Sequence, residues 1–201
     1  MRLISPLDRI LLLIAALLAA FQVVRGIDGL QALAVACYTV GFGVLVIASL
    51  LLIILGFDVL DSPLVAIAAT LIPLSLSAGL IAQFLPGYVP AYFIFALVGF
   101  IAIIASRFAL PARPAVVILA LVHGVSGLVI FGLPLILAAQ GAVPGGFSLV
   151  GVGGGLIGIG GLLLSFLKAG RPLLSQQRIM AVFPLLLLLT TLAFVFGFRF
   201  I

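Results

Sequence analysis

Seven long apolar segments follow one another along the chain, and they limit the possible folds more than any other feature. Most of them reach the length of about 20 residues that a helix needs to cross the hydrocarbon core of a bilayer. They cover residues 8–25, 31–56, 63–86, 88–106, 115–139, 146–167 and 179–199. Only 6% of the residues are charged, against about 25% in soluble domains. The sequence therefore predicts an all-α integral membrane protein with seven transmembrane helices, forming a single membrane-embedded domain over residues 1–201.

The break between the third and fourth segments is the shortest and carries no charge. It consists of residues 85–90, where two prolines and a glycine occur within the stretch Leu-Pro-Gly-Tyr-Val-Pro. Such a cluster indicates that one helix ends and another begins. The alternative is a kink inside one longer helix, which would change the number of spans and the orientation of everything beyond it.

The basic residues divide unequally between the two sides that seven spans would create. One side holds seven of them, Arg2, Arg9, Arg107, Arg113, Lys168, Arg171 and Arg178, and the other holds only Arg25 and Arg199. Positive charges favour the cytoplasmic side of a membrane protein. We therefore expect a multi-pass protein of the inner or plasma membrane, with the N-terminus in the cytoplasm and the C-terminus outside. The loop over 57–62 carries Asp58 and Asp61 instead of bases, but acidic residues contribute little to this rule.

Glycine is concentrated in the sixth segment. At about 100° per residue, five glycines share one stripe of a helix, namely Gly151, Gly154, Gly155, Gly158 and Gly161. Gly153 and Gly160 fall nearly opposite that stripe. Small residues let helix backbones approach closely in a membrane, so we expect this segment to be the helix around which the others pack. Two alternative explanations of these glycines are that the helix bends at a hinge, or that glycine is simply common in membrane helices.

The last six segments form three hairpins of similar length, which indicates an internal repeat preceded by one extra helix. In each hairpin a proline is expected to open the second helix, and these are Pro63, Pro114 and Pro172. A further proline then lies inside each second helix, at Pro73, Pro134 and Pro184. Internal repeats are common in membrane folds built by duplication.

The run over 45–66, LVIASLLLIILGFDVLDSPLVA, resembles the repeated hairpin of the HdeD-type small membrane proteins. In that hairpin an apolar helix ends near a glycine, here Gly56, and a proline, here Pro63, opens the partner helix. Gly170 and Pro172 match the same outline less well. The resemblance implies six spans in three hairpins, from which the first span here departs, and a link to acid stress. It implies no catalytic site, so it transfers no site residues.

A small set of polar residues within the spans forms the candidate site: His123, Ser126, Ser75, Ser77 and Gln83. An ionisable group inside a membrane is a functional candidate by default, so His123 is a candidate proton relay or haem or chlorophyll ligand. The alternative is a neutral histidine bonded to a neighbouring helix. Ser75, Ser77 and Gln83 follow Pro73, so their polar groups either satisfy the carbonyl that proline leaves without a donor or form a broken-helix substrate site.

An enzyme is the least favoured class, because the chain has no set of acid, base and nucleophile inside its spans. Residues 124–127 match the G-x-S-G outline around the serine of rhomboid-type proteases, but that chemistry needs a histidine on another helix. One cysteine and one histidine predict no disulfide framework, metal set or cofactor. The scattered bases do not indicate nucleic acid. We expect a non-enzymatic protein with a structural, accessory or stress-related role. Its expected partners are membrane lipids and either a second copy of the chain or a larger membrane complex. The alternative is a small transporter or channel for an uncharged or weakly polar solute.

Overall fold

A computed structural model describes residues 3–27, 29–168, 170 and 172–201, without the side chains of residues 112 and 113. Within these residues the chain forms long helices and no strands. The helices are α1 (Pro6–Arg25), α2 (Ala32–Leu55), α3 (Pro63–Phe84), α4 (Val89–Ala109), α5 (Ala112–Ala139), α6 (Ser148–Lys168) and α7 (Gln176–Gly197). Short 3-10 helices connect or extend them, at η1 (Phe57–Asp61), η2 (Pro86–Tyr88), η3 (Gly145–Phe147) and η4 (Phe198–Phe200).

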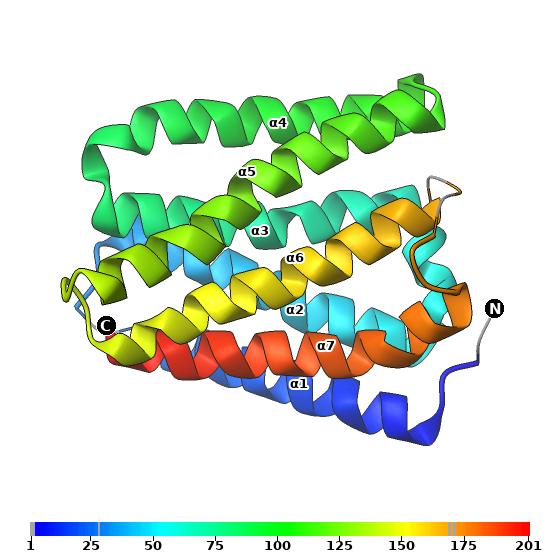
Figure 1. The fold of residues 1–201 in the computed structure, drawn as a ribbon, viewed down its shortest axis with the longest axis horizontal. Coiled ribbons are helices and arrows are strands. Elements are labelled where there is room, and N and C mark those ends of the chain that lie inside the picture. Colours follow the sequence, from blue (N-terminus) through cyan, green and yellow to red (C-terminus); the bar gives the residue numbers. More distant parts are fainter. Residues whose placement is uncertain (1–2, 28, 169, 171) are drawn as a thin grey trace.

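All seven of these helices are long and apolar enough to cross a membrane, which confirms the predicted fold class. This is the architecture of a multi-pass membrane protein. The segment over 85–90 is a reversal and not a kink, because α3 and α4 run in opposite directions on either side of η2 (Figure 1). The described residues therefore hold seven helices that could span a membrane, and the described chain begins at one end of the bundle and finishes at the other (Figure 1).

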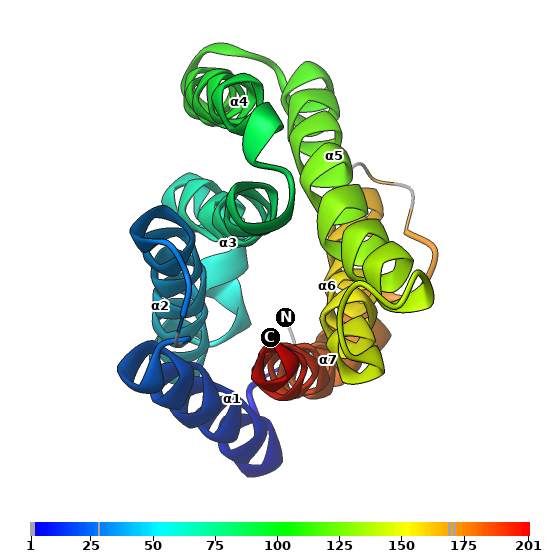
Figure 2. The same cartoon turned by 90° about the vertical axis from the view of Figure 1, so that its left-hand side faces the viewer.

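Six of the helices form a closed ring, and one lies outside it. Each of α1, α2, α3, α5, α6 and α7 packs against the next in that order, and α7 packs against α1. Helix α4 contacts α3 and α5 from the outside (Figure 2). The three predicted hairpins, α2–α3, α4–α5 and α6–α7, are present as neighbouring antiparallel pairs, but the middle one differs because its first helix is excluded from the ring.

The proline pattern also differs from one hairpin to the next. Pro63 is the first residue of α3 and Pro114 the third of α5. The prediction that Pro172 opens the following helix is wrong, because α7 begins at Gln176, where the hydroxyl of Ser175 accepts a hydrogen bond from the backbone of Arg178. The local sequence therefore starts this helix with a serine N-cap, and a strict repeat does not extend to the helix starts.

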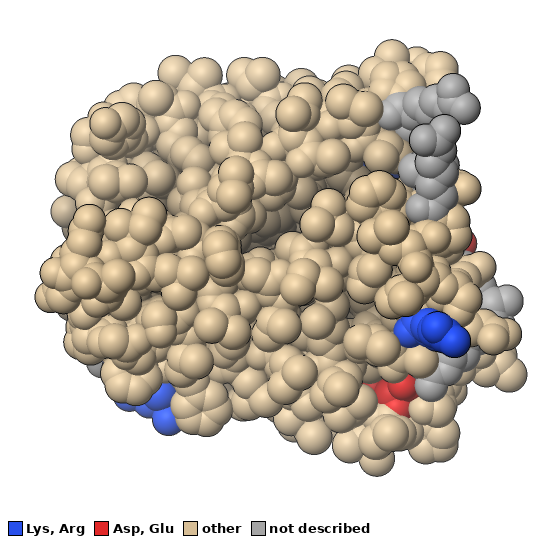
Figure 3. All heavy atoms as spheres, viewed as in Figure 1, with Lys and Arg blue, Asp and Glu red and all other residues tan. Residues whose placement is uncertain are grey.

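The two ends of the bundle differ in their number of basic residues. We call the end that contains η1 and the α4–α5 and α6–α7 connections the basic end. Its described basic residues are Arg9, Arg107, Arg113, Lys168 and Arg178, of which Arg113 is described in its backbone alone, whereas Arg25 and Arg199 lie at the opposite end. Arg2, Arg171 and Asp28 lie outside the described residues. On the face drawn in Figure 3, charged side chains lie near the two ends, and the surface between them is uncharged.

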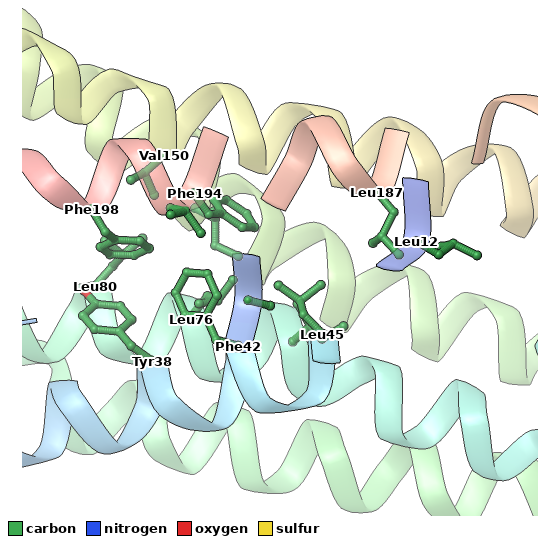
Figure 4. Packing of buried hydrophobic residues seen from close by; sticks show 14 of the residues in the cluster. Leu12, Tyr38, Phe42, Leu45, Leu76, Leu80, Val150, Leu187, Phe194 and Phe198 are labelled. Atoms are coloured by element: carbon green, nitrogen blue, oxygen red, sulfur yellow. The ribbon is translucent and has the colours of Figure 1, made fainter. Parts of the chain in front are cut away.

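Apolar side chains fill the interior of the ring. At the opposite end, Tyr38 and Phe42 from α2 meet Phe194 from α7 and Phe198 just beyond it (Figure 4). The ring centroids of Tyr38 and Phe198 are 4.6 Å apart, and Phe198 also lies 6.1 Å from Phe147 of η3. We call these five residues the aromatic plug. Because each is at most 3% exposed, the plug closes the ring at this end.

The most buried helix is α3 and not α6. In the most apolar 18-residue window of α3, 61% of the residues are buried, against 33% for α6. Helix α3 contacts α2, α4 and α5, whereas α6 contacts chiefly α5 and α7. The expectation that the glycine-rich helix is the one around which the others pack is therefore wrong, because the described helices form a ring without a central helix, and α3 is its most buried member.

Candidate functional site

One polar group joins helices α3, α4 and α5. The hydroxyl of Tyr92 on α4 donates a hydrogen bond to Oγ of Ser77 on α3 at 2.6 Å, and it lies 3.4 Å from Oγ of Ser126 on α5. Both serines are fully buried. In hydrocarbon such groups have no water to bond, so Tyr92 supplies the partner that holds α3, α4 and α5 together.

Gln83 belongs to a different contact. Its Oε1 accepts a hydrogen bond of 2.8 Å from the hydroxyl of Tyr38 on α2. The Tyr38 ring lies directly over Gly79 of α3, where a Cβ atom would collide with it. Gln83 and Ser77 therefore face different neighbours, although both belong to α3.

The serines that follow Pro73 bond within their own helix. Ser75 Oγ donates to the carbonyl of Leu71, and Ser77 Oγ donates to the carbonyl of Pro73 itself. The carbonyl that loses its helical donor at Pro73 belongs to Ala69, four residues earlier. The prediction that these hydroxyls satisfy that carbonyl is wrong.

His123 is held by its own helix. Its Nδ1 lies 3.1 Å from the carbonyl oxygen of Leu119 on α5. Since a carbonyl only accepts, Nδ1 carries the proton, and Nε2 is the ring nitrogen left for a second partner. The predicted bond to a neighbouring helix is replaced by a bond one turn back along α5. Ser126 is bonded by Tyr92 instead of by this imidazole, so the G-x-S-G outline at 124–127 lacks an activating base.

Arg107 lies within electrostatic range of basic side chains on two other helices, toward the basic end. Lys168, the last residue of α6, donates to the carbonyl of Leu60 in η1, and its Nζ lies 4.0 Å from Oδ1 of Asp61. Arg107, in the last turn of α4, is close enough for its charge to act on both His123 and Lys168. We call Arg107, His123 and Lys168 the basic cluster.

Arg107 is the least satisfied member of the basic cluster. Its Nε and Nη2 atoms are buried, and neither has a hydrogen-bond partner among the residues that the structure describes. Leaving a buried hydrogen-bond donor without a partner costs about 1–3 kcal/mol. Sequence reasoning assigned Arg107 to a loop because the fourth apolar segment ends at residue 106. The helix instead continues to Ala109 and brings the guanidinium into the protein.

The predicted glycine stripe on α6 faces a close neighbour along one part of the helix and open space along the other. A Cβ at Gly151 or Gly154 would collide with the backbone of α5, and one at Gly155 would press against the ring of Phe131. By contrast, a Cβ at Gly158 or Gly161 would have no atom within 4 Å. The stripe thus permits close packing near the opposite end and leaves open space toward the basic end.

The second glycine face contacts the other neighbour of α6. A Cβ at Gly153 would collide with Phe194, and one at Gly160 would collide with Leu186, both on α7. Helix α6 is therefore bare on two sides and lies between α5 and α7.

The open part of α6 borders a hollow in the surface. Helices α5 and α6 separate toward the basic end (Figure 1), and the space-filling view in the same orientation is hollowed between them (Figure 3). A separate cavity of about 310 Å³ lies between α3, α4 and α5, and its lining includes Ile81, Tyr92 and Val125. The five predicted polar residues thus do not surround one shared cavity. Comparison with protein-family models, with curated proteins and with solved structures finds no match to this chain.

Proposed function

We propose that this chain is a non-enzymatic multi-pass protein of the cell membrane with a structural or accessory role. The observation that carries the proposal is the filling of the helix ring by the aromatic plug and its apolar neighbours. A solute pathway through the ring would need a continuous polar lining. Here the polar side chains of α3 are instead used one by one, in contacts with α2, α4 and their own helix.

The arrangement of reactive groups supports a role without catalysis. Nucleophilic catalysis needs a base within hydrogen-bond reach of the nucleophile, whereas Ser126 is bonded by a tyrosine and His123 by a backbone carbonyl. The described acidic residues, Asp8, Asp58 and Asp61, lie in the first turn of α1 and in η1. None of these described acids lies on α5, which carries His123, or on α4 or α6 beside it.

The charge of the two ends supports an orientation with the basic end in the cytoplasm. In that orientation the N-terminus is inside and the C-terminus is outside. Membrane lipids are then the immediate partners, and the resemblance of residues 45–66 to HdeD-type hairpins favours a stress-related role, alone or in a larger complex. Reporter fusions at the two termini test the orientation, and finding both reporters on the same side of the membrane would exclude it.

A small transporter remains the second candidate, because the hollow between α5 and α6 and the open glycines Gly158 and Gly161 leave space beside His123's helix. Reconstituted vesicles separate the two functions. With a structural role, vesicles holding the purified protein should shrink in glycerol or urea, and reswell, at the rate of empty vesicles. A faster rate that His123→Ala abolishes, and that the exposed-site control Gln140→Ala retains, would replace the proposal with transport.

A further inference from the structure

The basic cluster has the composition of an anion site that lacks its anion among the described residues. Arg107 on α4 lies within electrostatic range of His123 on α5 and of Lys168 on α6, so two cations from separate helices come into the same region. Bringing such groups together raises their mutual repulsion. The nearest described acid is Asp61, whose side chain is 65% exposed and lies 4.0 Å from Lys168. One exposed carboxylate offsets only part of this positive charge.

The unpartnered atoms of Arg107 specify the shape of the missing group. Nε and Nη2 lie on the same edge of the guanidinium plane, and both are buried without a partner among the described residues. That edge presents two parallel N–H donors, which match two oxygens of a carboxylate or a phosphate. No other charged group supplies these oxygens within the described spans, since the described acids lie in α1's first turn and in η1.

The surroundings favour phosphate over carboxylate. The cluster lies near the basic end, next to the region where α5 and α6 separate and where Gly158 and Gly161 leave open space on α6. Basic pockets between transmembrane helices near the membrane surface bind the phosphate groups of lipids. The visible surface of the hollow between α5 and α6 shows no charged side chain (Figure 3), so it suits an acyl chain.

We propose that Arg107 and Lys168 of the basic cluster form a binding site for a phosphate group at the basic end, with Arg107 as the bidentate donor and Lys168 as a second cation. Two sources share this chemistry, an anionic phospholipid headgroup and free inorganic phosphate. This site does not depend on the structural role proposed above, because a transporter would use the same phosphate contacts.

A thermal-shift titration of the delipidated full-length protein tests the site. The chain has one cysteine, Cys37, so a thiol-reactive dye reports unfolding without added labels. The titrants are phosphatidylglycerol, phosphatidylcholine and inorganic phosphate, each added in detergent. We expect phosphatidylglycerol to raise the midpoint more than phosphatidylcholine. A rise with inorganic phosphate alone would identify free phosphate as the source.

Variants connect the shift to the cluster. Arg107→Gln should raise the half-maximal concentration about tenfold or more, because it removes both the charge and the paired donors. Arg107→Lys should give an intermediate value, and Lys168→Gln provides a test at a more exposed position if the Arg107 variants do not fold. Arg178→Gln removes an exposed charge from the same end and is the matched control. Equal shifts for all of these proteins, or no shift with either phosphate source, would overturn the proposal.

Discussion

The two halves of the helix ring are built from the same helices but are packed differently. Toward the opposite end, Gly151 and Gly154 allow α6 to meet the backbone of α5, and the aromatic plug fills the interior. Toward the basic end, Gly158 and Gly161 face open space. The arginines differ in the same way: the guanidinium of Arg199 lies 5.0 Å from the ring centroid of Phe196, whereas Arg107 has two buried nitrogens without a described partner.

Because the two halves are packed differently, we expect one half to determine the stability of the fold and the other to bind a ligand. Inside a membrane, helices associate through van der Waals packing and hydrogen bonds, since the surrounding lipid is as apolar as the protein core. The plugged half offers that packing, and we expect it to supply most of the stability. The basic half leaves open space beside α6 and buries two unpaired nitrogens of Arg107, so we expect substitutions at Arg107 and at the open glycines to change ligand binding more than folding.

The largest effect is expected at the centre of the plug. Phe198 is 3% exposed and contacts the rings of Tyr38, Phe42 and Phe147. Phe→Ala changes in soluble cores cost about 3–5 kcal/mol. Because part of that cost is transfer from water, we expect Phe198→Ala to lower the free energy of unfolding by about 2–4 kcal/mol, measured by circular dichroism during titration with SDS in mixed micelles.

The matched control for the plug is Phe108→Ala. Phe108 is 66% exposed on α4, so its ring faces the surroundings of the protein, and its loss should change the unfolding free energy by no more than about 0.5 kcal/mol. Equal destabilisation by the two variants would mean that the plug is no better packed than the surface, and the proposed division between the halves would be lost.

A smaller effect is expected from two glycines on the same stripe. A Cβ at Gly154 would lie 2.9 Å from backbone atoms of Ile130 and Phe131, which cannot move as a side chain can. Gly154→Ala should therefore cost about 1–3 kcal/mol through overpacking. Gly158→Ala should be neutral or stabilising by up to about 1 kcal/mol, because alanine favours the helix and nothing obstructs it. The same mixed-micelle titration compares them, and similar losses at both positions would contradict an open basic half.

The helices and their close contacts could be predicted from the sequence. Long uncharged segments have few alternatives to a helix in hydrocarbon, and the prolines and glycine of 85–90 placed the reversal that the structure confirms. The glycine periodicity of α6 predicted two bare faces, and the structure places α5 against Gly151 and α7 against Gly153. These features are local, so a few neighbouring residues determine them.

The order of the ring and the partners of the polar groups could not be predicted in this way. A soluble helix shows its buried face as an apolar stripe, but a helix in lipid is apolar on every side, so its pattern does not reveal which face meets protein. For this reason the sequence did not identify α3 as the most buried helix. It also did not predict that Tyr38 bonds Gln83 or that Tyr92 bonds Ser77. Arg107 was missed because orientation alone explained its charge.

The smallest effect is expected at the polar link between α3, α4 and α5. Tyr92→Phe keeps the ring, which is 9% exposed, and removes the hydroxyl that bonds Ser77 and lies near Ser126. Hydrogen bonds between membrane helices contribute about 0.6 kcal/mol each on average, so we expect a loss of about 1 kcal/mol in the mixed-micelle titration. Tyr88→Phe, at a position 66% exposed, should cost nothing measurable. Since α4 lies outside the ring, this link is one of its few specific attachments. If Tyr92→Phe costs no more than Tyr88→Phe, apolar packing alone holds α4 against α3 and α5. The buried serines would then be satisfied within their own helices.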